Sequence, residues 1–293
     1  MTRKTKPGRR LKTIVALAAW FAATGFAVLP LGAQTDATQT AAQVATNATA
    51  RRFRLEGEGF NNAAGSGFGN WWGGGVDVAW RPSAKVMAEG SIVSERRPGS
   101  NGSNDAESLA ALRAVIDWTK WFYTDVTVSG GGRDDPAAFF PRLRYDLTAN
   151  VKIPWAPGLI LTGGLTRLYF GAPVGGRIRR GGAIYYWRRF VFQGYLNFNN
   201  ARPGNHKSMS GNGAAQYGQE GRYWVGLVAG RGREAWQTLA LAPQDVEFTS
   251  YSASAFLRKW LAPNYGVAMS YGYTLKHTAY RINTVEAKFF WEF

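Results

Sequence analysis

The residues of this chain best suited to catalysis are its two histidines. His206 is followed by Ser208 and Ser210, and His277 lies in a segment that could meet the aspartates at 134–135. A histidine beside a serine or an aspartate can serve as a general base, as in hydrolases. A single loop histidine is more often only solvated, so we expect no enzymatic activity and no catalytic residue.

Metal and cofactor chemistry is poorly supported. Cysteine is absent, and two separated histidines without a set of carboxylates have no ligand spacing. The glycine runs at 73–75 and 130–132 precede no helix, so they are interpreted as kinks and turns rather than phosphate loops. The sequence therefore predicts no cofactor and no metal.

The last residues of the chain form a strand with two unlike faces. Charged residues and one aromatic residue occupy Glu286, Lys288, Phe290 and Glu292. Apolar residues alternate with them at Val285, Ala287, Phe289, Trp291 and Phe293. Such an ending is typical of the C-terminal strand of outer-membrane β-barrels, with apolar side chains facing lipid and charged ones facing the lumen. We interpret Phe289, Trp291 and Phe293 as an assembly signal for the barrel-assembly machinery.

The N-terminus has the layout of a secretory signal peptide. Six basic residues in the first twelve precede an apolar run from Ile14 to Leu31 and small residues at Gly32 and Ala33. We predict a signal peptide over 1–33, with an uncleaved anchor as the alternative. A low-complexity stretch over 34–51 is predicted to be a flexible linker. Residues 52–293 then form the barrel.

Period-two alternation continues through the rest of the chain and predicts an all-β, antiparallel, up-and-down transmembrane barrel. The predicted strands are 52–60, 72–80, 84–95, 107–118, 121–130, 142–153, 159–169, 181–187, 189–199, 208–218, 222–231, 249–260, 264–274 and 279–293. This count is about fourteen, or twelve if the weak strands eight and ten are loops. The segment 105–115 also fits a short helix, although a strand is preferred. Short connections follow even strands and mostly long ones follow odd strands, as in outer-membrane barrels.

Closure of the barrel must pair the first strand with the last. Antiparallel pairing places Arg52 and Arg54 beside Glu292, and Glu56 near Lys288, so that unlike charges meet. The side chains predicted to line the lumen are Arg52, Arg54, Glu56, Glu58, Glu89, Arg142, Arg144, Asp146, Lys152, Glu286, Lys288 and Glu292.

The net charge of +16 includes six positive charges in the signal peptide, which leaves +10 (16 minus 6) on the mature chain. An exported basic protein is expected to meet lipopolysaccharide phosphates or acidic glycans rather than nucleic acid. The basic residues predicted to be extracellular are Arg177, Arg179, Arg180, Arg202 and Arg233.

Tryptophans mostly fall at predicted strand ends and are interpreted as girdle residues at the membrane interface. They are Trp71, Trp72, Trp80, Trp118, Trp121, Trp155, Trp187, Trp224, Trp260 and Trp291.

Several segments resemble the YaiO-type outer-membrane β-barrel family over about 52–293. The residues that carry the resemblance are 114–118 before Trp121, 133–136 leading to 140–142 and 145–147, 181–183 with 185–186, 230–232 after 223–224, and 289–293. The resemblance implies an outer-membrane barrel without established enzymatic activity, in a family often found close to cell-surface polysaccharide synthesis and export. The chain departs from the family in its long N-terminal lead and its basic loop over 177–180.

Two functions remain open. The barrel is either a conduit for anionic solutes or cell-surface polysaccharide, or a closed structural or adhesive module that binds lipopolysaccharide or acidic polymers. An outer-membrane hydrolase is the third and weakest alternative. We expect outer-membrane lipid, lipopolysaccharide and the assembly machinery as partners.

Overall fold

The computed structural model describes residues 53–65, 69–98, 104–134, 138, 140–234, 248–276 and 280–293. The predicted signal peptide and linker, Arg52, Asp135 and His277 lie outside these residues, as does the side chain of Arg233. Among the described residues, no helix is long and apolar enough to cross a membrane.

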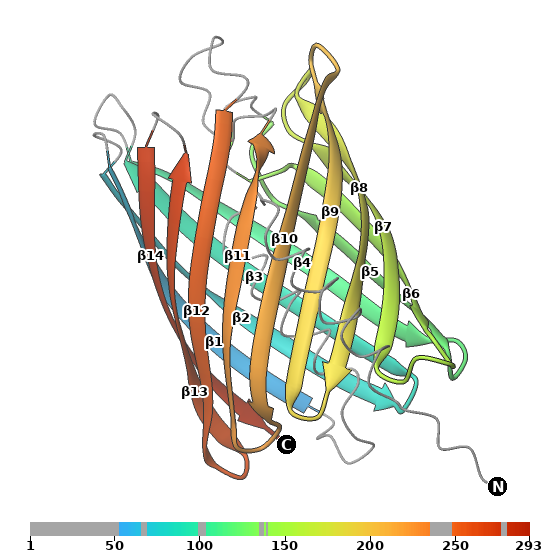
Figure 1. Cartoon of the computed structure of the whole chain (residues 1–293). Helices are drawn as coiled ribbons and strands as arrows, with labels where there is room; N and C mark the ends of the chain where they lie inside the picture. Colours follow the sequence, from blue (N-terminus) through green and yellow to red (C-terminus); the bar gives the residue numbers. More distant parts are fainter. Residues whose placement is uncertain are drawn as a thin grey trace, which may run out of the picture.

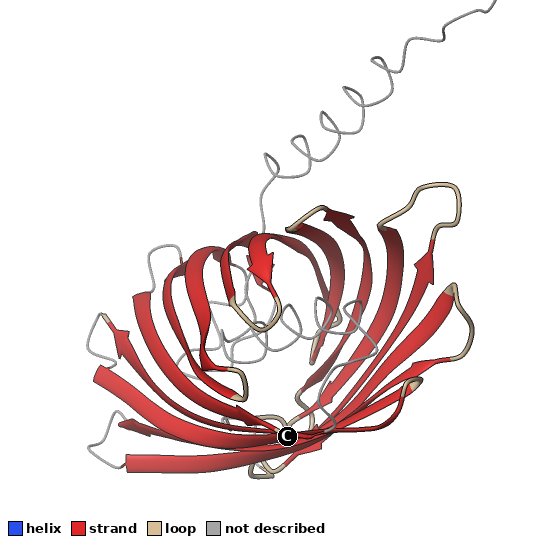
Figure 2. Cartoon of the chain, turned by 90° about the horizontal axis from the view of Figure 1, so that it is seen from below, coloured by secondary structure: helices blue, strands red, loops and turns tan. Residues whose placement is uncertain are grey.

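Fourteen antiparallel strands form one closed barrel, in which each strand pairs with its neighbours in the chain (Figure 1). The strands are β1 (Phe53–Ala64), β2 (Gly69–Ser83), β3 (Val86–Pro98), β4 (Asn104–Asp117), β5 (Phe122–Gly130), β6 (Leu143–Lys152), β7 (Leu159–Tyr169), β8 (Gly175–Trp187), β9 (Phe190–Arg202), β10 (His206–Gln219), β11 (Tyr223–Glu234), β12 (Phe248–Ala262), β13 (Tyr265–Lys276) and β14 (Tyr280–Glu292). Seen from below, the strands form the wall around the interior (Figure 2). The predicted fold class and the fourteen-strand count are confirmed.

The seam between β1 and β14 has the predicted direction and nearly the predicted register. Arg54 lies opposite Glu292, as expected, and the backbones of Phe53 and Phe293 exchange hydrogen bonds of 3.3 and 2.8 Å. Lys288 lies opposite Glu58 rather than beside Glu56. Lys288 is thus one inward-facing pair away from Glu56, near it as predicted, and the stagger of the two strands decides which carboxylate it faces directly.

The two rims of the barrel differ. One end, called here the turn rim, carries the short connections after the even strands together with the C-terminus (Figure 1). The other end, called the loop rim, is where the odd strands end and the even strands that follow them begin. Outer-membrane barrels place short turns in the periplasm and longer loops outside the cell.

Strands β8, β9 and β10 reach further toward the loop rim than predicted. Residues 177–180 belong to β8 rather than to a basic loop, and only Phe170–Val174 connects β7 to β8. The ladder continues because β7 and β9 both pair with this segment. Glycines at its ends weakened the strand signal without preventing the pairing.

Candidate functional site in the barrel lumen

Side chains alternate between the lumen and the outside of the barrel, with register shifts near the ends of β2 and β12. Buried charged residues such as Glu56 and Arg258 face inward, whereas large apolar residues such as Leu112 and Leu227 are exposed on the outside, at 72% and 65%. This is the inverse of a soluble protein, and it matches a wall with lipid on its outer face.

At the seam, a carboxylate is held by two arginines from different strands. Glu56 accepts a hydrogen bond of 2.7 Å from Arg258 Nη2, and Arg54 Nε forms an ion pair with the same carboxylate at 2.7 Å. Arg258 also stacks on the ring of Phe290, with its guanidinium carbon 3.8 Å from the ring centroid. Only 2% of the Arg258 side chain is exposed, so this ion pair is isolated from solvent.

A second group at the seam centres on Lys288. Its Nζ lies 2.5 Å from Glu58 and 3.2 Å from Glu286. Glu286 also accepts a hydrogen bond of 2.7 Å from the hydroxyl of Ser270. The structure therefore brings the described lumen residues of β1 and β14 together in two neighbouring ionic groups.

A third group lies on β3, β4 and β5. Arg113 binds Asp125 through two nitrogens and reaches Glu89 at 3.3 Å. Glu89 was predicted to face the lumen, whereas Arg113 and Asp125 were missed. The predicted strands contained both residues, and face parity was the signal that could have found them.

The basic residues of β6 are also engaged. Arg144 binds Asp146 at 2.6 and 2.9 Å, and Lys152 lies 3.4 Å from Asp117. Arg142 lies in the loop before β6, where it is exposed and binds Asp134 at 2.5 Å. The prediction that Arg142 lines the lumen wall was wrong, because the β6 ladder begins only at Leu143.

Three of the arginines predicted to be extracellular belong to the extended β8, and they divide between its faces. Arg180 faces the lumen, where its Nε donates to Asn197 Oδ1 at 3.0 Å and its guanidinium lies over Tyr195. Arg177 and Arg179 face outward. The prediction that Arg180 is an extracellular loop residue was wrong, because pairing with β7 and β9 extends β8 over residues 177–180. Arg202 ends β9 at the loop rim and is exposed.

Many of the side chains that line the wall on β9, β10, β12 and β13 are polar and uncharged, although Arg258 and Lys276 also face inward there. The uncharged inward side chains of these strands include Gln193, Asn197, Asn199, Ser208, Ser210, Asn212, Gln216, Ser250, Ser252, Ser254, Ser270 and Thr274. We call this set the amide–hydroxyl wall. Within it, Asn199 Nδ2 donates to the hydroxyls of Ser208 and Ser210, at 3.3 Å each.

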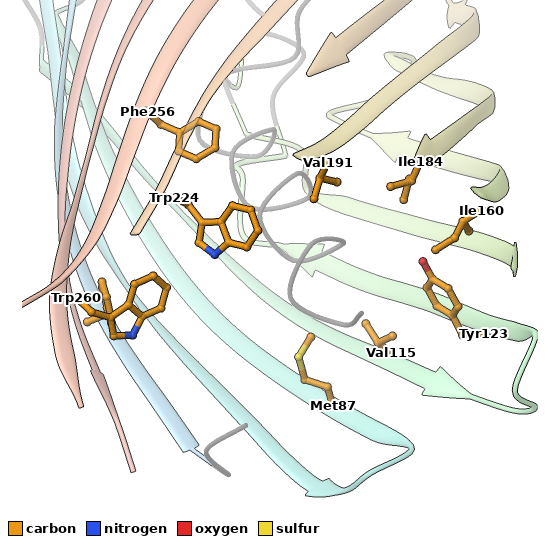
Figure 3. Close-up of a cluster of buried hydrophobic side chains, with 10 residues drawn as sticks. Met87, Val115, Tyr123, Ile160, Ile184, Val191, Trp224, Phe256 and Trp260 are labelled. Carbon is orange, nitrogen blue, oxygen red and sulfur yellow. The ribbon is translucent and has the colours of Figure 1, made fainter. Parts of the chain in front are cut away.

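The turn-rim end of the lumen carries a ring of apolar side chains, which project inward from strands spread around the barrel (Figure 3). The ring consists of Met87, Val115, Tyr123, Ile160, Ile184, Val191, Trp224, Phe256, Trp260 and Phe290. Glycines on the neighbouring strands leave space for two of the phenyl groups. A Cβ on Gly226 would lie 2.5 Å from Phe256, and one on Gly266 would lie 2.4 Å from Phe290. The rings of Phe256 and Phe290 therefore lie over glycines of the neighbouring strands.

The tryptophans divide between two positions. Those on the outside are exposed, as a girdle requires: Trp80, Trp118, Trp121, Trp155, Trp187 and Trp291 toward the turn rim, and Trp72 toward the loop rim. Trp71, Trp224 and Trp260 are buried in the lumen instead, so the girdle interpretation was wrong for these three. Phe289, Trp291 and Phe293, the predicted assembly signal, are all exposed on the outside.

One partly buried carboxyl group lies at the turn rim. Glu220, in the turn after β10, accepts a hydrogen bond of 3.2 Å from the indole of Trp224. Burial raises the pKa of the Glu220 carboxyl above its usual value, and the Trp224 hydrogen bond only partly opposes this. Glu220 is therefore a carboxyl group at this end of the barrel that holds its proton to a higher pH than usual.

His206, the described histidine, begins β10 on its lumen face together with Ser208 and Ser210. Asn199 binds these serines on the same face. The geometry offers no third group that would orient the imidazole as a base within the described residues.

Comparison with known proteins agrees with this architecture. Residues 59–237, more than half of the chain, match the model of the YaiO membrane beta barrel domain. The chain belongs to the YaiO membrane β-barrel family. It is an outer-membrane protein of this family, and the resemblance seen in the sequence is confirmed. Among curated proteins, none matches the chain.

Solved structures share the fold at low sequence identity. A "bacterial polysaccharide outer membrane secretin" aligns with a TM-score of 0.54 and 9% identity, covering 84% of this chain and 99% of that one. OpdQ of Pseudomonas aeruginosa aligns with a TM-score of 0.49 and 9% identity, over 85% and 99%. OmpF of Salmonella typhi, in complex with daunomycin, gives 0.46 and 9%, over 85% and 99%. At 9% identity, the likeness to the secretin concerns the fold alone.

Proposed function

We propose that this YaiO-family barrel is a non-enzymatic conduit for a hydroxyl-rich glycan. The observation that carries the proposal is the amide–hydroxyl wall. Amide and hydroxyl groups both donate and accept hydrogen bonds, as sugar hydroxyls do. A glycan could therefore exchange its hydrogen bonds with water for equivalent ones along this wall.

The charges of the lumen argue against a pore for free anions. Arg54, Arg113, Arg144 and Arg258 all bind carboxylates of the same barrel. Rings of charged side chains select ions when their field is uncompensated, whereas paired charges have weak fields at a distance. The predicted attraction of anionic solutes by Arg144 and Lys152 is therefore reduced, and neutral polymers are favoured.

The size of the barrel is compatible with this function. An eight-stranded barrel is filled by its own side chains, whereas barrels with sixteen or more strands leave an aqueous channel. Fourteen strands lie between these cases. A polysaccharide secretin shares the fold, so the architecture is one that a glycan-handling protein uses, although the likeness says nothing of specificity.

Single-channel recordings in planar bilayers test the proposal. We expect discrete conductance steps with weak ion selectivity, which are blocked by neutral maltooligosaccharides. Replacing Asn199 with leucine should weaken this block about tenfold, because two hydroxyls lose their amide partner and the wall becomes apolar. Asn200→Leu, one residue later on the outer face, is the matched control and should leave the block unchanged.

Other outcomes have clear meanings. Strongly anion-selective steps without oligosaccharide block would support the anionic-solute conduit instead. Silence under all conditions would favour the closed structural module, in which the apolar ring seals the turn rim. For assembly, we propose that the exposed Phe289, Trp291 and Phe293 are recognised by the barrel-assembly machinery.

A further inference from the structure

Two arginines face each other directly on the outside of the barrel. Arg167 of β7 and Arg177 of β8 are partners in the strand register, and both point outward. Lys207 of β10 lies in the same row of the sheet, two strands further on. We call these three residues the outer basic row.

No carboxylate in the described part of the chain lies within ion-pair distance of the outer basic row, in contrast to the arginines of the lumen. Like charges directly opposite each other on neighbouring strands are destabilising. Their repulsion is relieved when an anion bridges them, because guanidinium forks bind phosphate oxygens in pairs. An arrangement of this kind at a membrane surface is suited to a phosphate group.

The position of the row indicates where that phosphate comes from. β7 ends two residues after Arg167, and β8 begins two residues before Arg177, so the row lies next to the loop rim. The next row toward the turn rim is apolar apart from Arg179, and its members are Leu147, Leu165, Phe198 and Met209. All four of these side chains are exposed on the outside.

Charge above an apolar band is complementary to a phosphorylated lipid and not to a phosphate in solution. The acyl chains of such a lipid would cover Leu165 and Phe198 while its headgroup meets the arginines. Arg179 can extend its charged end toward the headgroup along its aliphatic stem. Arg202, exposed at the end of β9, adds positive charge at the same rim.

We propose that the outer basic row is a binding site for the phosphorylated glucosamine headgroup of a lipid A-type glycolipid in the outer leaflet. The site lies on the opposite face of the wall from the lumen, so it goes beyond the proposed conduit and does not depend on it. Lipid bound here would contact the outer face of the barrel along β7, β8, β9 and β10.

Thermal unfolding of the purified barrel in zwitterionic detergent micelles tests the site. Bis-phosphorylated lipid A should raise the Tm of the wild-type protein, because a ligand that binds only the folded state stabilises it. Arg167→Gln with Arg177→Gln should weaken the affinity at least about tenfold, since charge-assisted hydrogen bonds are lost. Without lipid A, the same variant should unfold at an equal or higher temperature than the wild type, because the repulsion is removed.

The double variant should thus have the lower Tm in the presence of lipid A and an equal or higher Tm in its absence. This difference separates a ligand site from a purely structural role. Lys120→Gln with Arg222→Gln removes two exposed cations at the turn rim and should bind lipid A as the wild type does. An equal shift with inorganic phosphate at the same concentration, or full affinity in the Arg167/Arg177 variant, would overturn the proposal. If that variant does not fold, Arg167→Lys with Arg177→Lys replaces it; unchanged lipid A affinity there would refute recognition by guanidinium forks.

Discussion

The inner and outer faces of this barrel use arginine in opposite ways. Inside, Arg258 is buried and shares Glu56 with Arg54, and Arg113 lies between Asp125 and Glu89. Outside, Arg167 and Arg177 face each other and no carboxylate of the described residues pairs with them. The same residue type is thus a structural cross-link on one face and an uncompensated charge on the other.

This difference shows where the positive charge of the protein is available. In the lumen, a charge removed from water must be paired, because an unpaired buried ion costs several kcal/mol. At a headgroup layer, water and lipid phosphates compensate a cation from outside the protein. The basic balance of the chain is therefore better interpreted as a property of its surface than of its pore.

The largest effect should come from breaking an inner ion pair. Replacing Arg258 with leucine leaves Glu56 paired with Arg54 and removes the cation over Phe290. We expect the free energy of unfolding to fall by about 3 kcal/mol, the usual cost of removing one member of a buried pair. Denaturant titration of the folded barrel in micelles measures this loss.

The matched control on the outer face is Arg179→Leu, which should change the free energy of unfolding by less than about 0.5 kcal/mol in the absence of lipid A. If both variants lost the same stability, inner and outer arginines would not differ as the geometry indicates.

A smaller effect is expected from two glycines on opposite faces. A Cβ on Gly266 would lie 2.2 Å from the backbone oxygen of Lys259 and 2.4 Å from Phe290, so Gly266→Ala should cost about 2 kcal/mol. A Cβ on Gly181, which faces outward, meets nothing within 4 Å. Gly181→Ala should therefore stabilise the strand by about 0.5 kcal/mol. Opposite signs in thermal unfolding support the packing of Phe290 against β13, and equal signs contradict it.

The smallest effect concerns pH at the turn rim. Because burial raises the pKa of Glu220, the folded state favours its protonated form. Its stabilising contribution is present below the unfolded-state pKa and is lost as pH rises through the higher folded-state value. Glu220→Gln should remove this decline, measured as unfolding free energy from about pH 4 to about pH 8. A variant with the wild-type pH profile would assign the decline to another group.

Much of the fold was predictable because period-two alternation is local. The face of Arg54, Glu56 and Glu58, and that of Glu286 and Lys288, followed from their own strands, and each of the fourteen predicted strands has its counterpart in the structure. Strand ends were less predictable. Segment 177–180 reads as a basic loop, and only pairing with β7 and β9 makes it a strand.

The partners of the lumen charges were the least predictable part. Arg258 lies on a predicted strand between Phe256 and Trp260, which share its face and are apolar. From the sequence, the face of Arg258 therefore did not read as the polar one. Its partner Glu56 is 202 residues away in sequence. Stagger between β1 and β14 also decided that Lys288 meets Glu58 rather than Glu56.

The sequence alone established that this chain forms an antiparallel barrel with an apolar outside and a polar inside. The features that show this are the alternation of side-chain type along single strands and the aromatic C-terminal strand. That information is local, because successive side chains of a strand point to opposite faces. Only the tertiary structure decided which charges neutralise one another and which do not. Register and closure set those distances, and they depend on every strand of the ring at once.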